Sequence, residues 1–297
     1  MQNHKCRRCL QMLFISLVAV FVSTGCTKED LSSCAPKSYT LTVSATDGQG
    51  NELTAETVKE VMLYVFDENN QYLGVHTGTQ VGQMVMLPYH TKEKITVVAW
   101  GNGAQGHQSM PTLTVGDKME TAFVSLLSQI RSTMDIAQSP DDLFYGSITL
   151  SKEHLTVDNK ISISRKTSSV IITARKLKQY AGAADDDFSY VLRKSTNKLD
   201  FYGKSNGTDV GYRPEAAFDN TGQFVSPIFN ILSTTSNIEI DIYHSGVLMA
   251  TVVGDSTGKP FQAVEGKLLN VLIDFSADVT VTVSVTKWGH QEIWKEF

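Results

Sequence analysis

One stretch near the end of the chain alternates apolar and polar residues without a break. In "VTVTVSV", residues 279–285, Val279, Val281, Val283 and Val285 alternate with threonines and a serine. Successive side chains of a β-strand point to opposite faces of the sheet, so one face here is apolar and the other polar. The pattern predicts a half-buried strand and disfavours a helix, whose apolar positions recur every three to four residues.

The same spacing recurs along most of the chain. Further apolar or alternating runs of strand length lie at 39–45, 61–66, 95–100, 161–164, 169–174, 238–243 and 268–275. Turn-forming clusters such as "DGQGN", "DENN", "DNTG" and "HSG" separate them. Helical turns are expected only within 54–60 and 118–130. Short strands at this spacing predict an all-β protein made of antiparallel sandwiches.

A weak internal repeat bears on the domain organisation. "FDENNQYL" (66–73) and "FDNTGQFV" (218–225) share Phe-Asp, then Gln, an aromatic and an aliphatic residue at matching offsets. Each predicts a strand, a tight turn and a returning strand. The repeat suggests two similar sandwiches with a boundary near 156–160. The alternative is that any two hairpins look alike.

The first 25 residues have the three parts of a secretory signal peptide. A basic start precedes ten residues, 13–22, of which only Ser16 is polar, and the small residues "STG" follow directly before Cys26. Crossing a bilayer takes about 20 apolar residues. This shorter run therefore predicts export of the chain rather than a membrane-spanning helix.

Cys26 has two alternative roles. Small residues followed by cysteine resemble the lipobox of bacterial lipoproteins, in which the thiol is acylated and becomes the first mature residue. Ser23 stands where that motif usually has leucine. The alternative is a disulfide to Cys34, which an oxidising envelope permits. The two roles exclude each other, and we predict lipid attachment at Cys26, which leaves Cys34 free or bonded to another chain.

The composition of the remaining chain limits its partners. Without residues 1–25, 272 residues remain, with 23 basic and 31 acidic side chains and a net charge of −8. An acidic chain with no basic patch argues against a nucleic-acid partner. Apart from 13–22, no apolar run approaches membrane length, so we expect lipid to be the only tether to a membrane.

Catalytic and metal-binding motifs do not stand out. "GNGAQG" (101–106) matches G-x-G-x-x-G, but Pro111 and renewed alternation follow it. A dinucleotide site needs a helix that starts at those glycines, and this sequence cannot supply one. The histidines are scattered, and the acidic runs 141–142 and 185–187 lack the spacing of a calcium loop. We therefore predict that the chain is not an enzyme and holds no metal.

Several segments, taken in order, resemble the FimB/Mfa-type family of fimbrial anchor proteins, which are lipoproteins of Bacteroidetes. They are "CTKEDLSSC", "VMLYVFDENNQYLG", "ITVVAWGN", "DDLFYG" and "ISISRKTSSVIITA". In the first, Lys28, Glu29 and Asp30 resemble the signal that moves lipoproteins of that phylum to the outer face of the outer membrane. A solvated charge cluster is the alternative. The likeness runs from Cys26 to the last predicted strand.

The resemblance implies two tandem transthyretin-like antiparallel β-sandwich domains and no catalysis. It implies a lipid-anchored, cell-surface base subunit that attaches a fimbria to the outer membrane, with a stalk pilin as its partner. We expect no cofactor and no small-molecule substrate. The predicted segments are a signal peptide (1–25), a lipidated linker (26–37), an N-terminal sandwich (38–157) and a C-terminal sandwich (158–297).

The resemblance also suggests how subunits join. In related stalk pilins, a trypsin-like protease cuts behind the first strand, usually after arginine, and the vacated groove accepts a strand from a neighbouring subunit. After Arg8, the next arginine in this chain is Arg131. We therefore expect the first strand, "SYTLTVSA" (38–45), to stay in place and to keep its groove filled.

Two modes of joining the first stalk pilin stay open. In one, the chain donates residues 279–297 as a strand. In the other, 279–285 is a core strand of the second domain, and "EIWKEF" or another surface makes an edge contact. The candidate contact residues are Val279, Val281, Val283, Val285, Trp288 and Trp294.

Two other functions remain as alternatives. The chain could be a stand-alone surface lipoprotein that binds a glycan or another ligand, or a tip adhesin of the same fold. Exposed aromatic rings serve as platforms for sugars, and the three tryptophans Trp100, Trp288 and Trp294 are candidates. Trp100 ends an apolar strand and is expected in the core instead.

Overall fold

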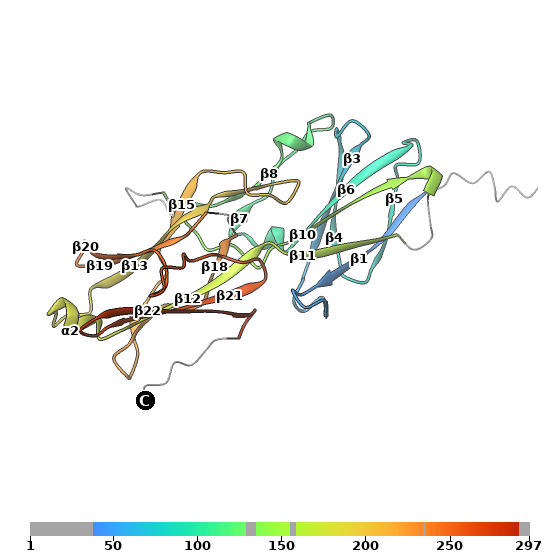
Figure 1. The fold of residues 1–297 in the computed structure, drawn as a ribbon. Helices are drawn as coiled ribbons and strands as arrows, with labels where there is room; N and C mark the ends of the chain where they lie inside the picture. The colour runs from blue at the N-terminus through green and yellow to red at the C-terminus, as the bar shows by residue number, and fades with distance from the viewer. Residues whose placement is uncertain (1–37, 129–134, 155–158, 234–235, 291–297) are drawn as a thin grey trace, which may run out of the picture. The chain divides into compact units, whose positions relative to one another are not determined.

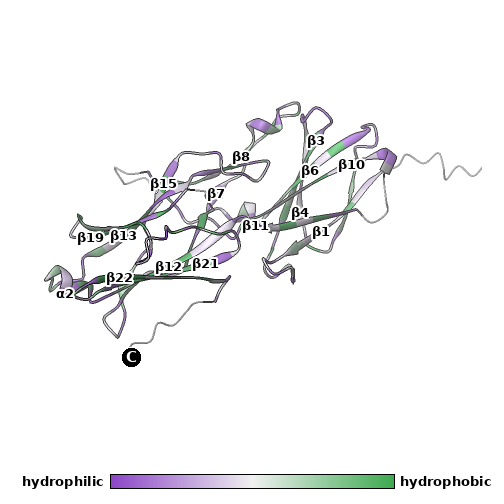
Figure 2. Cartoon of the chain, in the orientation of Figure 1, coloured by the Kyte–Doolittle hydropathy of each residue, from purple (hydrophilic) through white to green (hydrophobic). Residues whose placement is uncertain are grey.

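The computed structural model describes residues 38–128, 135–154, 159–233 and 236–290 (Figure 1). Most of these residues lie in strands and the turns between them, and apolar stretches on the strands alternate with hydrophilic turns (Figure 2). Within the described ranges, no helix is long and apolar enough to cross a membrane. The predicted all-β class is confirmed.

The N-terminal sandwich is built from one ladder of strands that folds into two layers. Its order is β2-β1-β11-β10-β6-β3-β4, and β5 also pairs with β1. The bounds are β1 Tyr39–Thr46, β2 Glu52–Leu53, β3 Val61–Asp67, β4 Tyr72–Thr79, β5 Met84–Leu87, β6 Lys94–Gly101, β10 Phe144–Ser151 and β11 Lys160–Arg165. β10 pairs with β6 along its whole length but with β11 only at Phe144 and Tyr145. The ladder divides into its two layers at this position. The first core is enclosed by side chains of β1, β3, β6 and β11.

The C-terminal sandwich consists of two separate sheets. The first has the order β16-β17-β12-β21-β22, with β18 also paired to β12, and the second has the order β20-β19-β13-β15-β9. The bounds of the first are β12 Thr167–Arg175, β16 Ala217–Phe218, β17 Phe224–Val225, β18 Phe229–Leu232, β21 Lys267–Phe275 and β22 Val279–Lys287. Those of the second are β9 Ile136–Ala137, β13 Phe188–Thr196, β15 Asp209–Tyr212, β19 Glu239–His244 and β20 Val247–Val252. Side chains of β12, β13, β19 and β21 fill the second core.

A third cluster of buried side chains joins strands of both sandwiches. Phe201 packs edge-on against Tyr64, with ring centroids 4.9 Å apart, and lies 6.0 Å from Trp100. A small sheet runs beside this cluster, with strands β7 Gln108–Ser109, β8 Phe123–Leu126 and β14 Lys198–Asp200. The short helices are η2 Gly103–Gln105, η3 Met119–Thr121, η4 Lys152–His154 and α2 Leu177–Ala181. The prediction of little helix is confirmed, and η3 lies within 118–130, but 54–60 forms turns without a helix, and η2, η4 and α2 lie outside both segments.

One nearly continuous strand passes from the first sandwich into the second. β11 ends at Arg165 and β12 begins at Thr167, so only Lys166 separates them (Figure 1). All nine residues of β12 are buried. β11 pairs in parallel with β1, and β12 pairs in parallel with β21. These parallel pairs, together with β15 and β9, differ from the purely antiparallel sheets that the sequence predicted.

Strand pairing does not divide the chain at residues 157 and 158. β11 lies after that position but pairs in the N-terminal ladder. β9 lies before it but pairs with β15 of the C-terminal sandwich. Ser38–Phe297 form one compact unit. The domain boundaries therefore stay a prediction, and the two sandwiches exchange segments on both sides of the proposed boundary.

Several hairpins and loops contain the same type of turn, which begins with an aspartate. In each, the aspartate side chain accepts hydrogen bonds from the N–H groups two and four residues later, and its carbonyl accepts from the N–H three residues later. The residue at that third position has positive φ, as Asn70 (57°) and Gly222 (79°) do. This is the three-residue loop with a left-handed position that suits twisted hairpins. The turns start at Asp47, Asp67, Asp200, Asp219 and Asp255.

This turn explains the weak repeat in the sequence. "FDENNQYL" and "FDNTGQFV" form the β3–β4 and β16–β17 hairpins, as predicted. Because the same turn occurs at three further places, the shared residues report local turn chemistry. The repeat by itself therefore gives no support to a duplicated domain.

We predict that Gly146→Ala destabilises the protein. Gly146 lies where β10 leaves β11, and an added Cβ would stand 2.2 Å from the backbone oxygen of Ser162. Because a backbone atom cannot rotate away, we expect a loss of about 3 kcal/mol in the free energy of unfolding, measured with urea. Gly48→Ala is the control, since its Cβ would meet only Lys267 at 3.6 Å. A change for Gly146→Ala within about 0.5 kcal/mol, the range of a surface substitution, would contradict the account.

Candidate functional site

β22 is the last strand of the first sheet in the C-terminal sandwich, and it lies at the edge of that sheet. It pairs antiparallel with β21 without a shift in register, from Val279 opposite Phe275 to Lys287 opposite Lys267. No strand of the described residues pairs with its other side. Edge strands expose unpaired N–H and C=O groups that can accept another strand.

One contact shows in which direction the backbone N–H and C=O groups of β22 point. The Val281 N–H donates to Ser256 Oγ at 2.6 Å, and the Val281 carbonyl accepts from the Ser256 N–H at 3.0 Å. The backbone of Val281 therefore points away from β21, and the same holds for every second residue. Val283 and Val285 consequently turn their N–H and C=O groups outward, where no backbone partner occurs among the described residues. We call this stretch the open edge.

The four valines of this strand are less buried than an internal strand would be. Val281 and Val283 pack against the second core, as the alternation predicted. Val279 and Val285, however, are 46% and 50% exposed. The prediction that 279–285 forms a strand is confirmed, and this strand belongs to the second sandwich, but it lies at the edge of its sheet, with a neighbouring strand on one side only.

A hollow of about 320 Å³ lies beside the open edge. Val283 and Val285 line it together with Leu269 of β21, and the other lining residues are Asp255, Lys259, Pro260, Gln262 and Val264. Leu269 stands directly opposite Val285 in the ladder and belongs to the second core. The hollow is therefore apolar on the sheet side and carries one acid and one lysine. We call it the edge hollow.

The connection between β20 and β21 forms the far side of this hollow. Its Asp255 turn presents Ser256 to β22, and Ile238, directly before β19, donates to the Phe261 carbonyl at 3.2 Å. Phe261 itself is buried in the second core. The Thr257 hydroxyl and the Lys259 N–H lower the pKa of Asp255, because both donate hydrogen bonds to its carboxylate. The connection thus contacts both sheets and leaves only part of the edge uncovered.

Trp288 follows β22 and packs within its own chain. Its ring lies 4.6 Å from the Arg165 guanidinium, which also stacks on the Phe144 ring at 4.9 Å. Cations are attracted to aromatic faces in this geometry. Trp288 is a candidate subunit contact from the sequence, but the structure gives it an internal partner at the junction of β11 and β12.

Asp142 completes that junction. Arg165 Nε donates to both of its carboxylate oxygens, at 3.0 and 2.9 Å, and the Thr167 hydroxyl donates at 3.3 Å. The Arg165 side chain is only 7% exposed. Burial raises the pKa of Asp142, and the Arg165 charge opposes that rise. Because Arg165 is buried and the Asp142 side chain is only 21% exposed, breaking the pair is costly, since one largely desolvated charge is left without a partner.

The first strand of the chain lies where the sequence predicted it. β1 is paired on one side with β11 and on the other with β2 and β5. Its inward side chains Tyr39, Leu41, Val43 and Ala45 are at most 1% exposed. The groove that β1 occupies is therefore filled by the chain itself.

Five candidate residues lie outside the described residues. They are the proposed lipid site Cys26, the export signal Lys28, Glu29 and Asp30, and Trp294 of the C-terminal segment. Their roles stay predictions.

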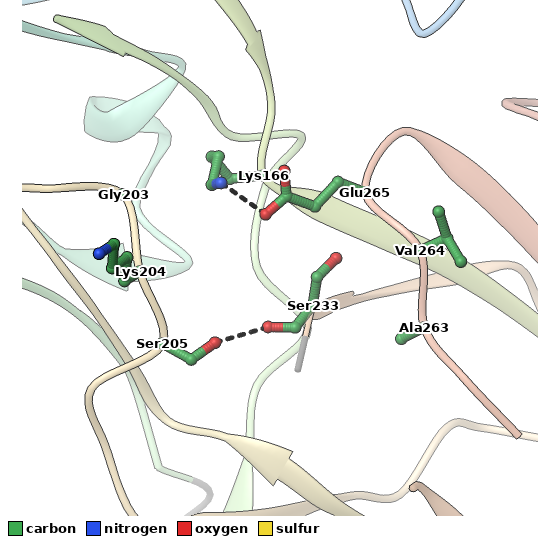
Figure 3. A pocket seen from close by; sticks show the side chains of 8 residues that line it. All are labelled: Lys166, Gly203, Lys204, Ser205, Ser233, Ala263, Val264 and Glu265. Carbon is green, nitrogen blue, oxygen red and sulfur yellow. Dashed lines mark hydrogen bonds and ion pairs between the residues drawn. The ribbon is translucent and has the colours of Figure 1, made fainter. Parts of the chain in front are cut away.

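A larger hollow, of about 680 Å³, opens between the loop at 203–205 and residues 263–265 (Figure 3). Lys166 and Glu265 form an ion pair at 2.5 Å on its wall, and the Ser205 hydroxyl donates to the Ser233 carbonyl at 2.8 Å. These polar groups bond mainly to one another. No nucleophile with an adjacent base faces the hollow among its described lining residues, so its chemistry gives no sign of a reaction.

Other candidate sites from the sequence have structural roles. "GNGAQG" forms a turn with the short helix η2 and no α-helix follows it. Within the described ranges, no cluster of His, Cys, Asp and Glu could hold a metal ion. Trp100 is fully buried, as predicted, and Trp288 packs on Arg165. Neither of these two tryptophans offers an open platform for a sugar.

The sequence did not reveal three parts of this site. Ser256 and the edge hollow come from a loop about 25 residues before β22, and only the "DSTGK" turn signal (255–259) hinted at its shape. Arg165 lies inside the longer motif "ISISRKTSSVIITA", and nothing in the sequence distinguishes it. Its role depends on Asp142 and Trp288, which are far from it in the sequence.

Comparison with known proteins identifies relatives of this chain. The family model for fimbrillin-A associated anchor proteins Mfa1 and Mfa2 matches residues 31–294. The major fimbrium anchoring subunit FimB of Porphyromonas gingivalis strain W83 is 31% identical over 290 residues, covering 92% of this chain and 93% of FimB. A second FimB sequence from that species is 32% identical over 281 residues, covering 89% and 90%.

A solved structure agrees with the fold. The fimbrial anchor protein Mfa2 from Porphyromonas gingivalis superposes with a TM-score of 0.63 at 13% identity, covering 84% of this chain and 97% of Mfa2. The chain thus has two sandwiches of strands and shares its fold with that protein. It belongs to the family of fimbrillin-A associated anchor proteins Mfa1 and Mfa2.

We predict that Arg165→Ala strongly destabilises the protein. The substitution leaves the Asp142 carboxylate without its charged partner and removes the cation between Phe144 and Trp288. We expect a loss of about 3–5 kcal/mol in the free energy of unfolding, measured with urea.

The double variant Asp142→Asn with Arg165→Met is the control for this prediction. It leaves no buried charge, so we expect it to be more stable than Arg165→Ala alone. A single variant that unfolds at the same urea concentration as the unmodified chain would contradict a structural role for the pair.

Proposed function

We propose that this chain is the base subunit of a fimbria, held in the outer membrane by a lipid on Cys26. The observation that carries the proposal is the likeness to FimB, a major fimbrium anchoring subunit, over nearly the full length of both chains. The signal-like residues 1–25 directly before Cys26 support it. A cysteine that carries two or more acyl chains stays in a bilayer, whereas a single chain binds only marginally.

In the N-terminal sandwich, β1 itself fills the groove that could accept a strand from a neighbour. This supports a position of the subunit at the end of the fibre. β1 begins 13 residues after Cys26 and is paired on both sides. Removal of β1 would separate the sandwich from its lipid and would expose the side chains of the first core. We therefore infer that β1 remains in the assembled subunit, and that this sandwich takes no strand from a neighbour.

The open edge of β22 is the surface that we assign to the first stalk pilin. An added strand would bond to the N–H and C=O groups of Val283 and Val285, each bond contributing about 1 kcal/mol net. Its inward side chains would enter the edge hollow, and one buried aliphatic or aromatic side chain contributes about 2–3 kcal/mol. Donation of residues 279–287 is less favourable, because it would strip β21 of its antiparallel partner along the whole strand.

The role of Cys26 can be tested in the native cells. We expect Cys26→Ser to release the tagged protein into the medium, because its lipid is lost. Cys34→Ser is the matched control and should stay with the membranes. Fractionation followed by immunoblotting measures both.

The same extracts test incorporation into a fibre. Strand-paired subunits separate slowly, so unboiled SDS samples should show a ladder of heavier bands that collapses on boiling. A single monomer band before and after boiling would contradict the fimbrial role. Membrane retention of Cys26→Ser would contradict only the lipid anchor.

A further inference from the structure

Another hollow, of about 270 Å³, lies on the outer face of the N-terminal sandwich. Its floor is the outer side of β6 and β10, where Ser147 stands opposite Val98 and Thr149 stands opposite Thr96 in the ladder. The other lining residues are Tyr145 of β10, Asn70 of the Asp67 turn, Met119 of η3, and Phe201 and Tyr202 of the Asp200 turn. We call it the hydroxyl hollow.

The nine described residues that line the hydroxyl hollow carry no charge. Six of them end in a hydroxyl or an amide, and the other three, Val98, Met119 and Phe201, are at most 4% exposed. The edge hollow and the larger hollow, in contrast, each carry an acid and at least one lysine. A ligand that fits this lining is neutral and rich in hydroxyls, because an ion would lose its hydration here without gaining an opposite charge.

Internal hydrogen bonds decide which hydroxyl groups of the hollow can donate to a ligand. The Tyr145 hydroxyl donates to the Phe201 carbonyl at 3.2 Å. Burial raises the pKa of Tyr145, and a hydrogen bond from Ser147 opposes that rise, so the oxygen of Ser147 remains free to accept. The hydroxyl oxygens of Thr96 and Thr149 lie 3.2 Å apart, and because only one of them donates to the other, one proton stays available. The hollow thus offers an acceptor at Ser147 and a donor at the threonine pair.

One aromatic ring lines the hollow and is held in place before any ligand arrives. Tyr202 is 41% exposed, its hydroxyl donates to Glu120 at 3.1 Å, and its N–H donates to the Asp200 carboxylate at 3.0 Å. Because both ends of this residue are bonded, a ligand that contacts the ring costs little conformational entropy. Exposed rings of this kind suit partners that combine an apolar face with polar edges.

We propose that the hydroxyl hollow binds one neutral sugar ring of a glycan. A hexose has an apolar face of C–H groups, which matches the Tyr202 ring, and hydroxyls around its edge that both donate and accept. Ser147 and Thr149 are two residues apart on one strand, which places them about 7 Å apart along it. Hydroxyls on opposite sides of a single sugar ring can reach both. This binding goes beyond the anchoring role and involves neither the lipid nor the stalk pilin.

NMR spectra of the isotope-labelled, purified chain test the site. The probes are the methyl glycosides of glucose, galactose, mannose and N-acetylglucosamine, with glucuronate as the charged counterpart. We expect at least one neutral glycoside to shift the amide signals of Thr96, Ser147 and Thr149 until they saturate, and glucuronate to bind no more tightly. The proposal is overturned if no neutral glycoside moves these signals, or if glucuronate binds more tightly than every neutral probe.

Matched variants show whether the threonine hydroxyl and the tyrosine ring contact the sugar. Thr149→Val keeps the shape of the side chain and suits a strand, and Tyr202→Ala removes the ring. Each should weaken binding of the responding glycoside about fivefold or more, as expected for a lost hydrogen bond or ring contact.

The controls make the same changes at exposed positions of the C-terminal sandwich. They are Thr282→Val on β22 and Tyr180→Ala on α2, and both should leave the affinity unchanged. Amide spectra without sugar confirm that each variant is folded. If folded Thr149→Val and Tyr202→Ala chains bind the glycoside as tightly as the unmodified chain, the sugar does not occupy this hollow and the proposal is wrong.

Discussion

The ion pair between Arg165 and Asp142 stabilises the junction of β11 and β12, on which the rest of the structure depends. There the chain passes from β11 into β12 with a single residue between the strands. The guanidinium bonds both carboxylate oxygens and is stacked between Phe144, which begins β10, and Trp288, which follows β22. This largely buried ion pair therefore lies both where the first sandwich divides into layers and where β22 ends.

The two sandwiches are attached to this continuous strand in the same way. β1, the first strand, pairs in parallel with β11, and β21 pairs in parallel with β12 and carries β22 on its far side. Paired strands thus connect the strand nearest to the proposed lipid with the strand that offers the open edge. For a tether between a membrane and a fibre, this means that load passes through backbone hydrogen bonds and a buried core at each step.

The sequence revealed local features well and distant contacts poorly. The period of two predicted β1 and β22 closely, and the turn-forming clusters predicted the hairpins. The alternation of Val279 to Val285 could not show that β22 lies at an edge, because the same pattern serves any half-buried strand. The parallel pairs β1–β11 and β12–β21, and the contact of Ser256 with Val281, join segments far apart in the chain, so no local pattern encodes them.

The central claim is that a stalk subunit pairs with the open edge of β22. Val285→Pro tests it most directly, because proline removes an N–H that points outward and leaves the bonds to β21 intact. Val279→Pro is the matched control, since it makes the same change on the other side of the Ser256 contact. Our account predicts that cells with Val285→Pro keep the folded subunit in the membrane but shed their fimbriae into the medium, as counted by electron microscopy, whereas Val279→Pro cells keep them. Fimbriae retained on Val285→Pro cells would contradict the account.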